Sequence, residues 1–499
     1  MPLGFRFFIG WFVLCAWMYA VQDSTANEGP TQPNIIVIMS DDQAQWTLGA
    51  YKKTMVETPH LDRLAKEGVL FANAMSSAPV CSPSRASLYT GKIPSAHGVH
   101  DFLSESPKFN ADWLAGQTLL SERMKAVGYQ TAMIGKWHAT TDSREPQRGY
   151  DHWLSYDTQT AGWQNQYEHS GTVHFSRNGE PKTYKGVQAE FLTDEAVSFI
   201  DHARTKDKAR PFFINLNYVE PHSPFSGLPE RLVKKYRGKA DSLIRAGGTS
   251  DMIEMGENNL VPDDHGEKLA QYLAAVSLLD EQVGDLIGAL KRRKLLKNTL
   301  IVYVSDHGLL MGRYGVYGKT NATAQPNFYE ETIRVPLIVS GPENLVRNRQ
   351  TREEFVDLLD LHATLLDFAG ETMNLRGPGR SFSPLLKGLR TTDWRPYQYA
   401  ERGPSRMITD GHWKLVRTYS YDTAIPPKDR WYDLSHPMGE IRSTEPPRPA
   451  LQQKLSRALN DYFAMYETKE FSGRRIWDQP APNGRVKSEI ARDKNSLKP

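Results

Sequence analysis

The sequence has 499 residues, which is enough for one large domain with a smaller one, or for two or three domains of ordinary size. Hydrophobic residues make up 39% of the chain and charged residues 24%, as is typical of a soluble globular protein. The formal net charge is only +3 and no long run of Lys and Arg occurs, so the composition argues against nucleic-acid binding, although it is compatible with an anionic substrate.

Residues 1–26 have the features of a secretory signal peptide. Arg6 precedes an apolar run over residues 7–21, polar residues follow, and Ala20 and Ala26 are small residues suited to cleavage. An uncleaved membrane anchor is the alternative, because the run is only slightly shorter than a membrane-spanning helix. No other stretch is apolar and long enough to span a membrane. We therefore expect a secreted or periplasmic protein with no stable membrane span after signal removal.

Five short segments, rich in β-branched residues and bounded by polar or turn residues, predict buried parallel strands. They cover residues 34–42, 130–138, 211–222, 299–308 and 334–341. Helical patterns lie between them, over residues 118–127 and residues 269–290. Strands that alternate with helices predict an α/β fold, with a large, mostly parallel central sheet and helices on both faces.

The pattern changes after residue 383. Residues 407–417 predict a β-hairpin around a central Asp-Gly turn, residues 431–434 a further strand, and residues 451–466 an amphipathic helix. We therefore expect an α/β domain over residues 27–385 and a smaller C-terminal α+β subdomain with an antiparallel sheet over residues 386–470. The remainder, residues 471–499, is rich in charge and proline and predicts a poorly packed tail.

Ionisable residues end four of the five predicted strands. They are Asp41 and Asp42, Lys136 and His138, His222, and Asp306 and His307. In open α/β sheets ligands bind outside the carboxyl ends of the strands, so we expect these side chains to converge on one site. Three carboxylates around one point favour a hard divalent ion such as Ca²⁺ or Mg²⁺, whereas the imidazole of His307 better suits a transition metal. The identity of the ion therefore stays open.

The sequence contains two cysteines, and Cys15 would leave with the signal peptide. Cys81 would then be a single cysteine in an oxidising compartment: an inert buried residue, an intermolecular bridge or a functional group. Residues 86–88 suit the first turns of a helix, which puts Cys81 near a helix N-terminus, where backbone N–H groups favour anions. Arg85 adds a group that can hold an anion or the nucleophile itself.

The segment Cys81-x-Pro-Ser-Arg85, followed by Ala-Ser-Leu-Tyr-Thr-Gly, resembles the motif of the type I sulfatases of the alkaline-phosphatase-like superfamily. In that family the cysteine is oxidised to formylglycine before the protein folds. Further blocks resemble the family in the same order along the chain, at residues 34–42, 128–138, 220–222, 305–308 and 329–338. The resemblance covers most of the chain and implies an alkaline-phosphatase-like fold, in agreement with the α/β pattern.

The resemblance also implies a role for each matching residue. The metal would be held by Asp41, Asp42, Asp306, His307 and an oxygen of the modified Cys81. The formylglycine hydrate would be stabilised by Arg85 and Lys136 and hydrogen-bonded by His138, while His222 and Lys319 would contact the sulfate and the leaving oxygen. Two positions depart from the family pattern. Many relatives have Asn where His307 stands, and residues 320–328 separate Lys319 from the block that begins at residue 329.

The implied reaction is the hydrolysis of a sulfate ester, such as that of a sulfated carbohydrate. One hydroxyl of the hydrate attacks sulfur, and the other then expels sulfate as the aldehyde re-forms. His138 suits the base of the second step, and His222 or Lys319 the acid at the leaving oxygen in the first. The oxidation of Cys81 would require a partner, either a formylglycine-generating enzyme or an anaerobic sulfatase-maturating enzyme.

Other functions stay open on sequence alone. A phosphatase or phosphonate monoester hydrolase of the same superfamily would use similar residues, because sulfate and phosphate esters differ mainly in charge. A non-catalytic, carbohydrate-binding relative would keep Cys81 unmodified. A plain Cys–His hydrolase would leave the acidic cluster unexplained.

Three weaker signals complete the sequence. An aromatic cluster either lines a sugar-binding subsite or forms local core; it comprises Trp153, Tyr156, Trp163, Tyr167, His169 and His174. Four residues of the C-terminal subdomain either edge the pocket or belong to solvated surface, namely Arg402, Arg406, His412 and Trp413. Asn321-Ala-Thr is a glycosylation sequon, which matters only in a eukaryotic secretory host.

Overall fold

The architecture is that of a computed structural model. It describes Met1 and residues 32–51, 56–104, 112–239, 261–323, 325–371, 377–420, 422–436 and 439–479. The predicted signal peptide, apart from Met1, lies outside these residues, and the described residues from Pro33 to Gln479 belong to one compact unit. No helix within the described ranges combines the length and apolar character needed to cross a bilayer.

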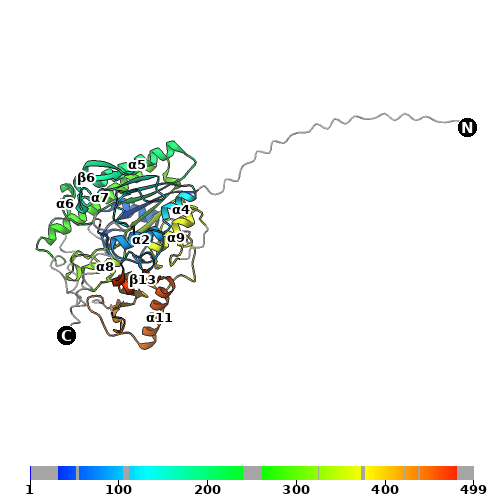
Figure 1. The fold of residues 1–499 in the computed structure, drawn as a ribbon. Coiled ribbons are helices and arrows are strands. Elements are labelled where there is room, and N and C mark those ends of the chain that lie inside the picture. Colours follow the sequence, from blue (N-terminus) through cyan, green and yellow to red (C-terminus); the bar gives the residue numbers. More distant parts are fainter. Residues whose placement is uncertain are drawn as a thin grey trace. The chain divides into compact units, whose positions relative to one another are not determined.

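A large sheet forms the centre of this unit (Figure 1). It has ten strands in the order β11-β2-β10-β9-β1-β8-β4-β5-β6-β7. Its five middle strands run parallel. These are β9 (Thr299–Ser305), β1 (Asn34–Ser40), β8 (Phe212–Asn217), β4 (Gln130–Gly135) and β5 (His152–Tyr156). The prediction of a large, mostly parallel sheet is confirmed.

Shorter or more exposed strands extend both edges of the sheet. One edge carries β10 (Leu337–Ser340), β2 (Val69–Phe71) and β11 (Gln350–Arg352), and the other β6 (Ser170–Arg177) and β7 (Glu180–Val187). The strand predicted over residues 334–341 is present as β10, but its expected parallel direction is wrong, because β10 pairs antiparallel with β9. Among its described residues, the connection over residues 306–336 has no helix longer than the four residues of α8. No crossover helix therefore carries the chain back to the opposite end of the sheet, as a parallel partner of β9 would require.

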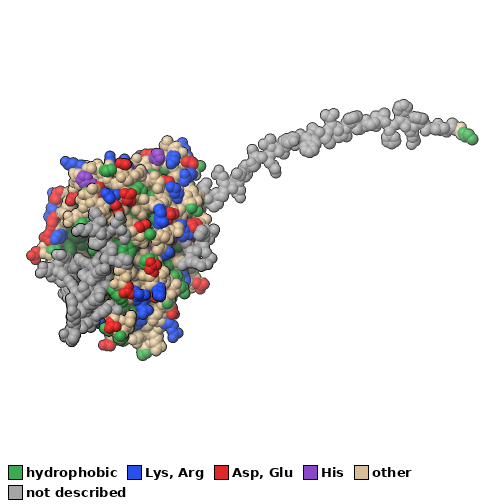
Figure 2. Space-filling view, viewed as in Figure 1, with side chains coloured by type: hydrophobic (Ala, Val, Ile, Leu, Met, Phe, Trp, Pro, Cys, Tyr) green, Lys and Arg blue, Asp and Glu red, His purple; other side chains and the backbone are tan. Residues whose placement is uncertain are grey.

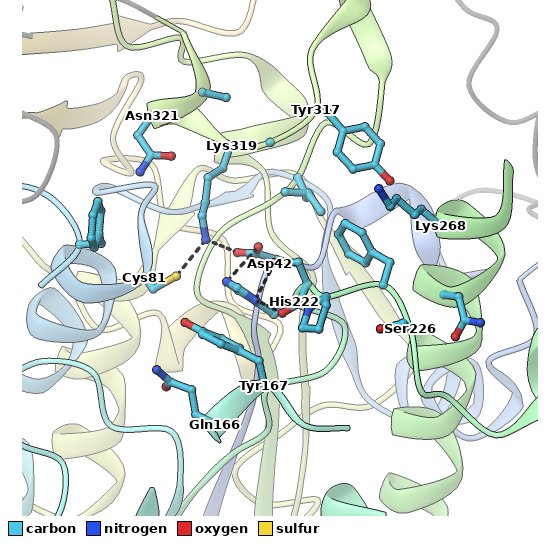
Figure 3. A pocket seen from close by; sticks show the side chains of 18 of the residues that line it. Asp42, Cys81, Gln166, Tyr167, His222, Ser226, Lys268, Tyr317, Lys319 and Asn321 are labelled. Atoms are coloured by element: carbon cyan, nitrogen blue, oxygen red, sulfur yellow. Dashed lines mark hydrogen bonds and ion pairs between the residues drawn. The ribbon is translucent and has the colours of Figure 1, made fainter. Parts of the chain in front are cut away.

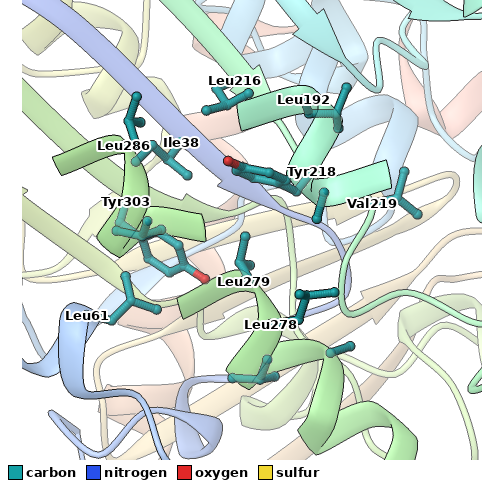
Figure 4. Packing of buried hydrophobic residues seen from close by; sticks show 14 of the residues in the cluster. Ile38, Leu61, Leu192, Leu216, Tyr218, Val219, Leu278, Leu279, Leu286 and Tyr303 are labelled. Carbon is teal, nitrogen blue, oxygen red and sulfur yellow. The ribbon is translucent and has the colours of Figure 1, made fainter. Parts of the chain in front are cut away.

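Helices cover both faces of the sheet. Successive apolar side chains of β1 point to opposite faces, and each face needs a cover that removes these side chains from water. Ile36 and Ile38 belong to the core under α1 (Pro59–Glu67), α5 (Gln188–Lys206), α6 (Glu230–Tyr236) and α7 (His265–Arg292). Figure 4 shows Ile38 beside Leu286 of α7 in this core. The opposite face packs on α2 (Cys81–Thr90), α4 (Leu120–Ala126), α9 (Leu358–Phe368) and α10 (Ser383–Leu386). The helices predicted at residues 118–127 and 269–290 are thus confirmed.

The C-terminal part adds a four-stranded antiparallel sheet, as predicted. Its strands are β13 (Gln398–Arg402), β14 (Ser405–Thr409), β15 (Trp413–Thr418) and β16 (Lys428–Asp433). Helix α11 (Pro449–Tyr466) packs on it through Leu455, Leu459 and Phe463. The short elements β3 (Ala74–Met75), β12 (Val356–Asp357), α3 (Pro94–His97) and α8 (Glu330–Ile333) connect these layers.

The predicted tail starts later than expected. Residues Gly473–Asp478 form a 3₁₀ helix, and Ser472 and Ile476 are buried, so the chain stays packed up to Gln479. The apolar side chain of Ile476 explains this, because it gains free energy from burial that a purely charged segment would not. Lys and Arg side chains are interspersed with Asp and Glu over the visible face of the molecule (Figure 2), in keeping with the small net charge.

Candidate active site

The parallel strands bring the predicted strand-end residues to one edge of the sheet. Ser40 of β1 lies in register with Ser305 of β9, and the Asp306 N–H donates to the Ser40 carbonyl at 3.2 Å. Across the same gap, the Asp42 N–H donates to Asp306 Oδ1 at 3.2 Å. Asp42 has a left-handed backbone, with φ of 64°, which turns its carboxylate back over the strand ends. The expected convergence on one site is confirmed.

Cys81 is the first residue of α2 and lies among these groups, with only 2% of its surface exposed. Its Sγ is 3.0 Å from Lys319 Nζ (Figure 3). It is also 3.2 Å from His307 Nε2 and 3.4 Å from Asp41 Oδ1. Burial alone would raise the pKa of the Cys81 thiol, but Lys136, Lys319 and His307 outweigh it and hold this pKa well below its usual value. The side chain at position 81 thus sits where negative charge is stabilised.

Two cations are buried against the acidic residues. Arg85 donates from Nε to Asp306 Oδ2 at 3.0 Å, and its Nη2 forms an ion pair with the same oxygen at 2.9 Å. Lys136 Nζ pairs with Asp41 Oδ2. Burial and Cys81 raise the pKa of Asp41, but Lys136, His222 and Arg85 lower it by more than this rise. The pKa therefore lies below its usual value, and the carboxylate stays ionised. For Asp306, burial and the Asp41 charge prevail and raise the pKa to about 6. The carboxylate of Asp306 is therefore less fully compensated by nearby cations than that of Asp41.

The donor set fits a divalent cation. His307 Nδ1–H can donate to the Gly308 carbonyl at 3.0 Å, which directs the Nε2 lone pair toward Cys81 Sγ, Asp42 Oδ1 at 3.2 Å and Asp306 Oδ1 at 3.7 Å. A lone pair aimed at three electron-rich atoms is repulsive unless a proton or a metal lies between them. Burial lowers the pKa of His307, but the negative charges of Asp306, Cys81 and Asp42 outweigh burial and raise it to about 9. The site therefore favours a positive charge at this position. Oxygen or nitrogen atoms of Asp41, Asp306 and His307 lie within 4.8 Å of one another and of Cys81 Sγ.

Three further side chains surround Cys81 on the outer side. Lys319 Nζ pairs with Asp42 Oδ1 at 2.6 Å, so the segment after Lys319 does not remove it from the site. His222 Nε2 lies 3.6 Å from Asp42 Oδ2, and its ring stacks on that of Tyr167 with centroids 4.3 Å apart. His138 Nε2 bonds to the Leu103 carbonyl at 2.9 Å, while its Nδ1 has no hydrogen-bond partner among the described residues. All the sequence-predicted site residues thus lie in this one cluster.

The cluster opens into a cavity of about 990 Å³ (Figure 3). Cys81, Asp42, His222 and Lys319 line its inner end. Sequence reasoning did not find the residues of its other walls, which include Phe102, Leu103, Phe225, Lys268, Tyr317 and Asn321. No local pattern marks these residues, since they come together from four separate segments. Phe225, three residues after His222, and Tyr317 and Asn321, each two residues from Lys319, could have been inferred from these neighbours.

Of the residues in the predicted aromatic cluster, some line the cavity and others do not. Trp163 and Tyr167 line the cavity, and Trp163 is 56% exposed, whereas Trp153 and Tyr156 are buried core residues. His169 is buried against Glu220, and His174 is exposed on β6.

The interpretation of Arg402 and Arg406 as pocket edge or solvated surface is wrong, because both are buried in ion pairs with Asp101 and Glu401 respectively. Asn321, of the glycosylation sequon, faces the cavity. His412 is exposed and Trp413 half-buried on the small sheet.

Comparisons with known proteins agree with this site. A family model described as Sulfatase matches residues 33–371, well over half of the chain, and one described as N-sulphoglucosamine sulphohydrolase, C-terminal, matches residues 317–462. An N-acetylglucosamine-6-O-sulfatase from Bacteroides thetaiotaomicron is 29% identical over 486 residues, covering 81% of this chain and 82% of the relative. An ulvan-active sulfatase from Formosa agariphila is 31% identical over 383 residues, covering 75% of this chain and 69% of the relative.

Solved structures share the fold. A protein in complex with its substrate D-glucosamine-2-N,6-O-disulfate superposes with a TM-score of 0.72 at 24% identity, covering 87% of this chain and 98% of that one. A phosphonate monoester hydrolase of Agrobacterium radiobacter gives a TM-score of 0.68 at 20% identity, covering 87% of this chain and 96% of the other. With its strand-end cluster and the family match across the sheet domain, the chain belongs to the sulfatase family of the alkaline-phosphatase-like superfamily and is a sulfuric ester hydrolase.

Proposed function

We propose that the chain is a secreted or periplasmic sulfatase that hydrolyses sulfate esters of a carbohydrate, with Cys81 oxidised to formylglycine and a divalent metal, Ca²⁺, in the strand-end cluster. The observation that carries this proposal is the set of opposite charges that meets at Cys81. Its Sγ has an ammonium group at 3.0 Å, an imidazole at 3.2 Å and a carboxylate at 3.4 Å, all at the inner end of one cavity.

Asp41, Asp42, Asp306 and His307 would hold the metal, together with the oxygen that replaces Cys81 Sγ. When bound, the metal supplies positive charge that stabilises anionic oxygens of the ester, an effect that is typically worth several kcal/mol. The oxidised side chain supplies an aldehyde hydrate, with one hydroxyl to attack sulfur and a second to release sulfate. Mg²⁺ or another divalent ion is the alternative occupant, since His307 departs from an all-oxygen donor set.

His138 and Lys319 have different proposed roles, one as a base and the other as a fixed positive charge. His138 donates from Nε2 to the Leu103 carbonyl, so in the neutral ring Nδ1 keeps its lone pair and can accept a proton from a hydroxyl at position 81. Burial lowers the pKa of Lys319, but Asp42 and Cys81 raise it well above its usual value, so Lys319 remains an ammonium group. Lys319 therefore suits electrostatic stabilisation of the leaving oxygen.

His222 is then the better donor of the proton to the leaving oxygen. Its Nδ1 can donate to the Ser223 carbonyl at 2.6 Å, which directs Nε2 toward Asp42 and the cavity. Tyr167 covers one face of the ring and fixes its orientation. Arg85 and Lys136 lie deeper, where they hold Asp306 and Asp41 in place and counter charge that develops on the hydrate.

The proposal of a carbohydrate substrate is supported by the relatives and by the cavity. The relatives named above include an N-acetylglucosamine-6-O-sulfatase and an ulvan-active sulfatase. The exposed indole of Trp163 offers a flat apolar face at the cavity wall, next to Tyr167 with ring centroids 5.9 Å apart. Such a face suits a sugar ring attached to the sulfate ester that reaches Cys81.

The test measures modification and turnover in the same preparation. The full chain is co-expressed with a formylglycine-generating enzyme, the Cys81 peptide is analysed by mass spectrometry, and the N-terminus of the exported protein is sequenced. Turnover is then compared for matched sulfate, phosphate and phosphonate esters, with the Cys81→Ala variant as control. We expect formylglycine at position 81, cleavage near Ala26, and a preference for sulfate esters that Cys81→Ala abolishes. An intact thiol in an active enzyme would overturn the proposed nucleophile, and a preference for phosphonate esters the proposed substrate.

A further inference from the structure

The loop over residues 101–104 lies between the small C-terminal sheet and the side chains around Cys81. We infer that the buried Asp101–Arg402 ion pair is a positioning device, through which the C-terminal sheet holds this loop and thereby orients His138 for the reaction. The inference rests on the proposed function, because it concerns the same site. It assigns a role in catalysis to a sheet that supplies none of the metal-binding or proton-transfer residues proposed above.

The ion pair itself is fully enclosed. Arg402, the last residue of β13, is 1% exposed, and Asp101 is 0% exposed. Arg402 Nη2 donates to Asp101 Oδ2 at 2.6 Å, and its Nε reaches Asp101 Oδ1 at 3.4 Å. A buried ion pair gains little net stability over an apolar pair, because both charges lose their hydration. Its rigid, two-point geometry instead fixes the position of the backbone that carries Asp101.

A short run of hydrogen bonds leads from this pair to the reacting groups. Asp101 Oδ1 accepts the N–H of Phe102 at 2.9 Å, which shapes the start of the loop. The next peptide is held from both sides, since the Leu103 N–H donates to Ser82 Oγ at 2.9 Å and its carbonyl accepts from His138 Nε2 at 2.9 Å. Ser82 directly follows Cys81, so Leu103 links the nucleophile's helix to His138.

The bond to the Leu103 carbonyl decides which nitrogen of His138 can act. Because Nε2 must carry a proton to donate, the neutral ring has its lone pair on Nδ1, which is buried and has no hydrogen-bond partner among the described residues. His138 and Cys81 line the same cavity. If the loop moved, the ring could rotate or change tautomer, and the base would be lost without any change in His138 itself.

The C-terminal sheet provides a matched control for this role. Arg406 of β14 is also buried, at 3% exposure, and also forms an ion pair, with Glu401 at 3.2 Å. It also pairs with Glu467, donates to Ser95 and lies over the rings of Tyr419 and Phe463. None of these partners lines the cavity. Loss of Arg406 therefore disturbs the same small sheet to a similar degree but leaves residues 101–104 in place.

The experiment compares Arg402→Met with Arg406→Met in the metal-loaded, modified enzyme. Arg402→Met leaves the Asp101 charge unpaired and can prevent folding, so the double variant Asp101→Asn with Arg402→Met, which removes both charges, is included. Arg402→Lys tests whether one charge without the two-point geometry restores part of the function. The readouts are kcat and KM per formylglycine-containing molecule and hydrogen–deuterium exchange of the peptide spanning residues 99–104.

We expect the double variant to lower kcat roughly 10- to 100-fold with KM within about threefold, because a misplaced base affects the chemical step. Exchange of the peptide is expected to become at least about tenfold faster, Arg402→Lys to be intermediate, and Arg406→Met to match the wild type in both readouts. Unchanged kcat or unchanged exchange in the double variant overturns the inference, as does an equal effect of Arg406→Met. If the wild type turns over no sulfate ester, the proposed function fails. The exchange data still test whether the Asp101–Arg402 ion pair holds residues 101–104 in place.

Discussion

Around Cys81, each buried charge lies within contact distance of an opposite charge. This pairing determines which metal ion the acidic residues and His307 can bind. Asp42 has Lys319 at 2.6 Å and His307 at 3.2 Å, whereas Asp306 relies chiefly on Arg85. A divalent ion would take over much of the compensation that His307 provides, because an imidazole binds a metal through its unprotonated nitrogen. The nature of residue 307 should therefore decide which ion is preferred.

Replacing His307 with Asn changes a nitrogen donor to an amide oxygen. Oxygen donors favour Ca²⁺ and imidazole favours transition metals, so we expect His307→Asn to shift the ratio of the Mn²⁺ and Ca²⁺ dissociation constants toward Ca²⁺ by about tenfold. Calorimetric titration of the metal-stripped protein with each ion measures this ratio. His202→Asn, at an exposed position of α5, serves as the control. An unchanged ratio in His307→Asn would mean that this side chain is not a ligand.

Trp163 is the exposed residue of the cavity wall whose role is easiest to separate from the chemistry. Removing one aromatic stacking partner costs on the order of 1 kcal/mol, which corresponds to a roughly fivefold change in affinity. We expect Trp163→Ala to raise KM about fivefold for a sulfated disaccharide and to leave KM unchanged for a small sulfate ester without a sugar. Trp163→Phe, which keeps an aromatic ring, should retain most of the affinity. Steady-state kinetics on both substrates test this, and equal effects on the two would argue against stacking.

Among the elements, α2 has the most demanding position, because it carries Cys81 and all ten of its residues are buried. Helix α9 packs against α2, and His362 of α9 donates from Nδ1 to the Leu88 carbonyl of α2 at 2.7 Å. Burial lowers the pKa of His362 to about 4, so this imidazole is neutral in the folded protein. The free energy of unfolding therefore depends on pH through this residue.

The sign of this dependence follows from the lowered pKa. In the unfolded chain a histidine takes up a proton below about pH 6.5, whereas folded His362 does so only near pH 4, so stability is lost as pH falls through this window. For this residue we expect a loss of about 2 kcal/mol between pH 7 and pH 5. Urea unfolding at the two pH values should show that His362→Gln removes this part of the dependence. The exposed His202→Gln is the control, and parallel profiles for wild type and His362→Gln would contradict the prediction.

The elements also show what the sequence could and could not predict. Central strands such as β1 were predictable, because their uninterrupted apolar runs reflect burial on both faces. The β6–β7 hairpin was missed, since exposed residues dominate β7 and blur the alternation. Its turn did carry a signal, because Asn178-Gly179 has positive φ at both residues, as a type I′ turn requires. The direction of β10 and the Asp101–Arg402 pair depend on tertiary contacts, so no local pattern could reveal them.

For the whole molecule, the two sheets share an apolar core in addition to the cores that each sheet has of its own. One apolar cluster joins Phe328 and Tyr329, which directly precede α8, to Met407 and Tyr432 of the small sheet. Lys414 of β15 crosses the same boundary, where its ammonium group donates to the Phe328 carbonyl at 2.6 Å and pairs with Glu330 at 2.8 Å. The domain boundary proposed at residue 385 thus separates two topologies but cuts through shared packing.

This shared core predicts that residues 33–479 unfold as one cooperative unit. Calorimetry should give a single transition, with calorimetric and van't Hoff enthalpies in agreement. Lys414→Met would leave Glu440 without its buried cation, a change that costs roughly 3–5 kcal/mol, and should lower the midpoint of that one transition by several degrees. If the small sheet folded independently, the same variant would shift one of two separate transitions and leave the other in place. A fragment that ends at residue 385 would then be soluble and folded, whereas the shared core predicts that it aggregates, because the apolar side chains of Phe328 and Tyr329 lose their cover.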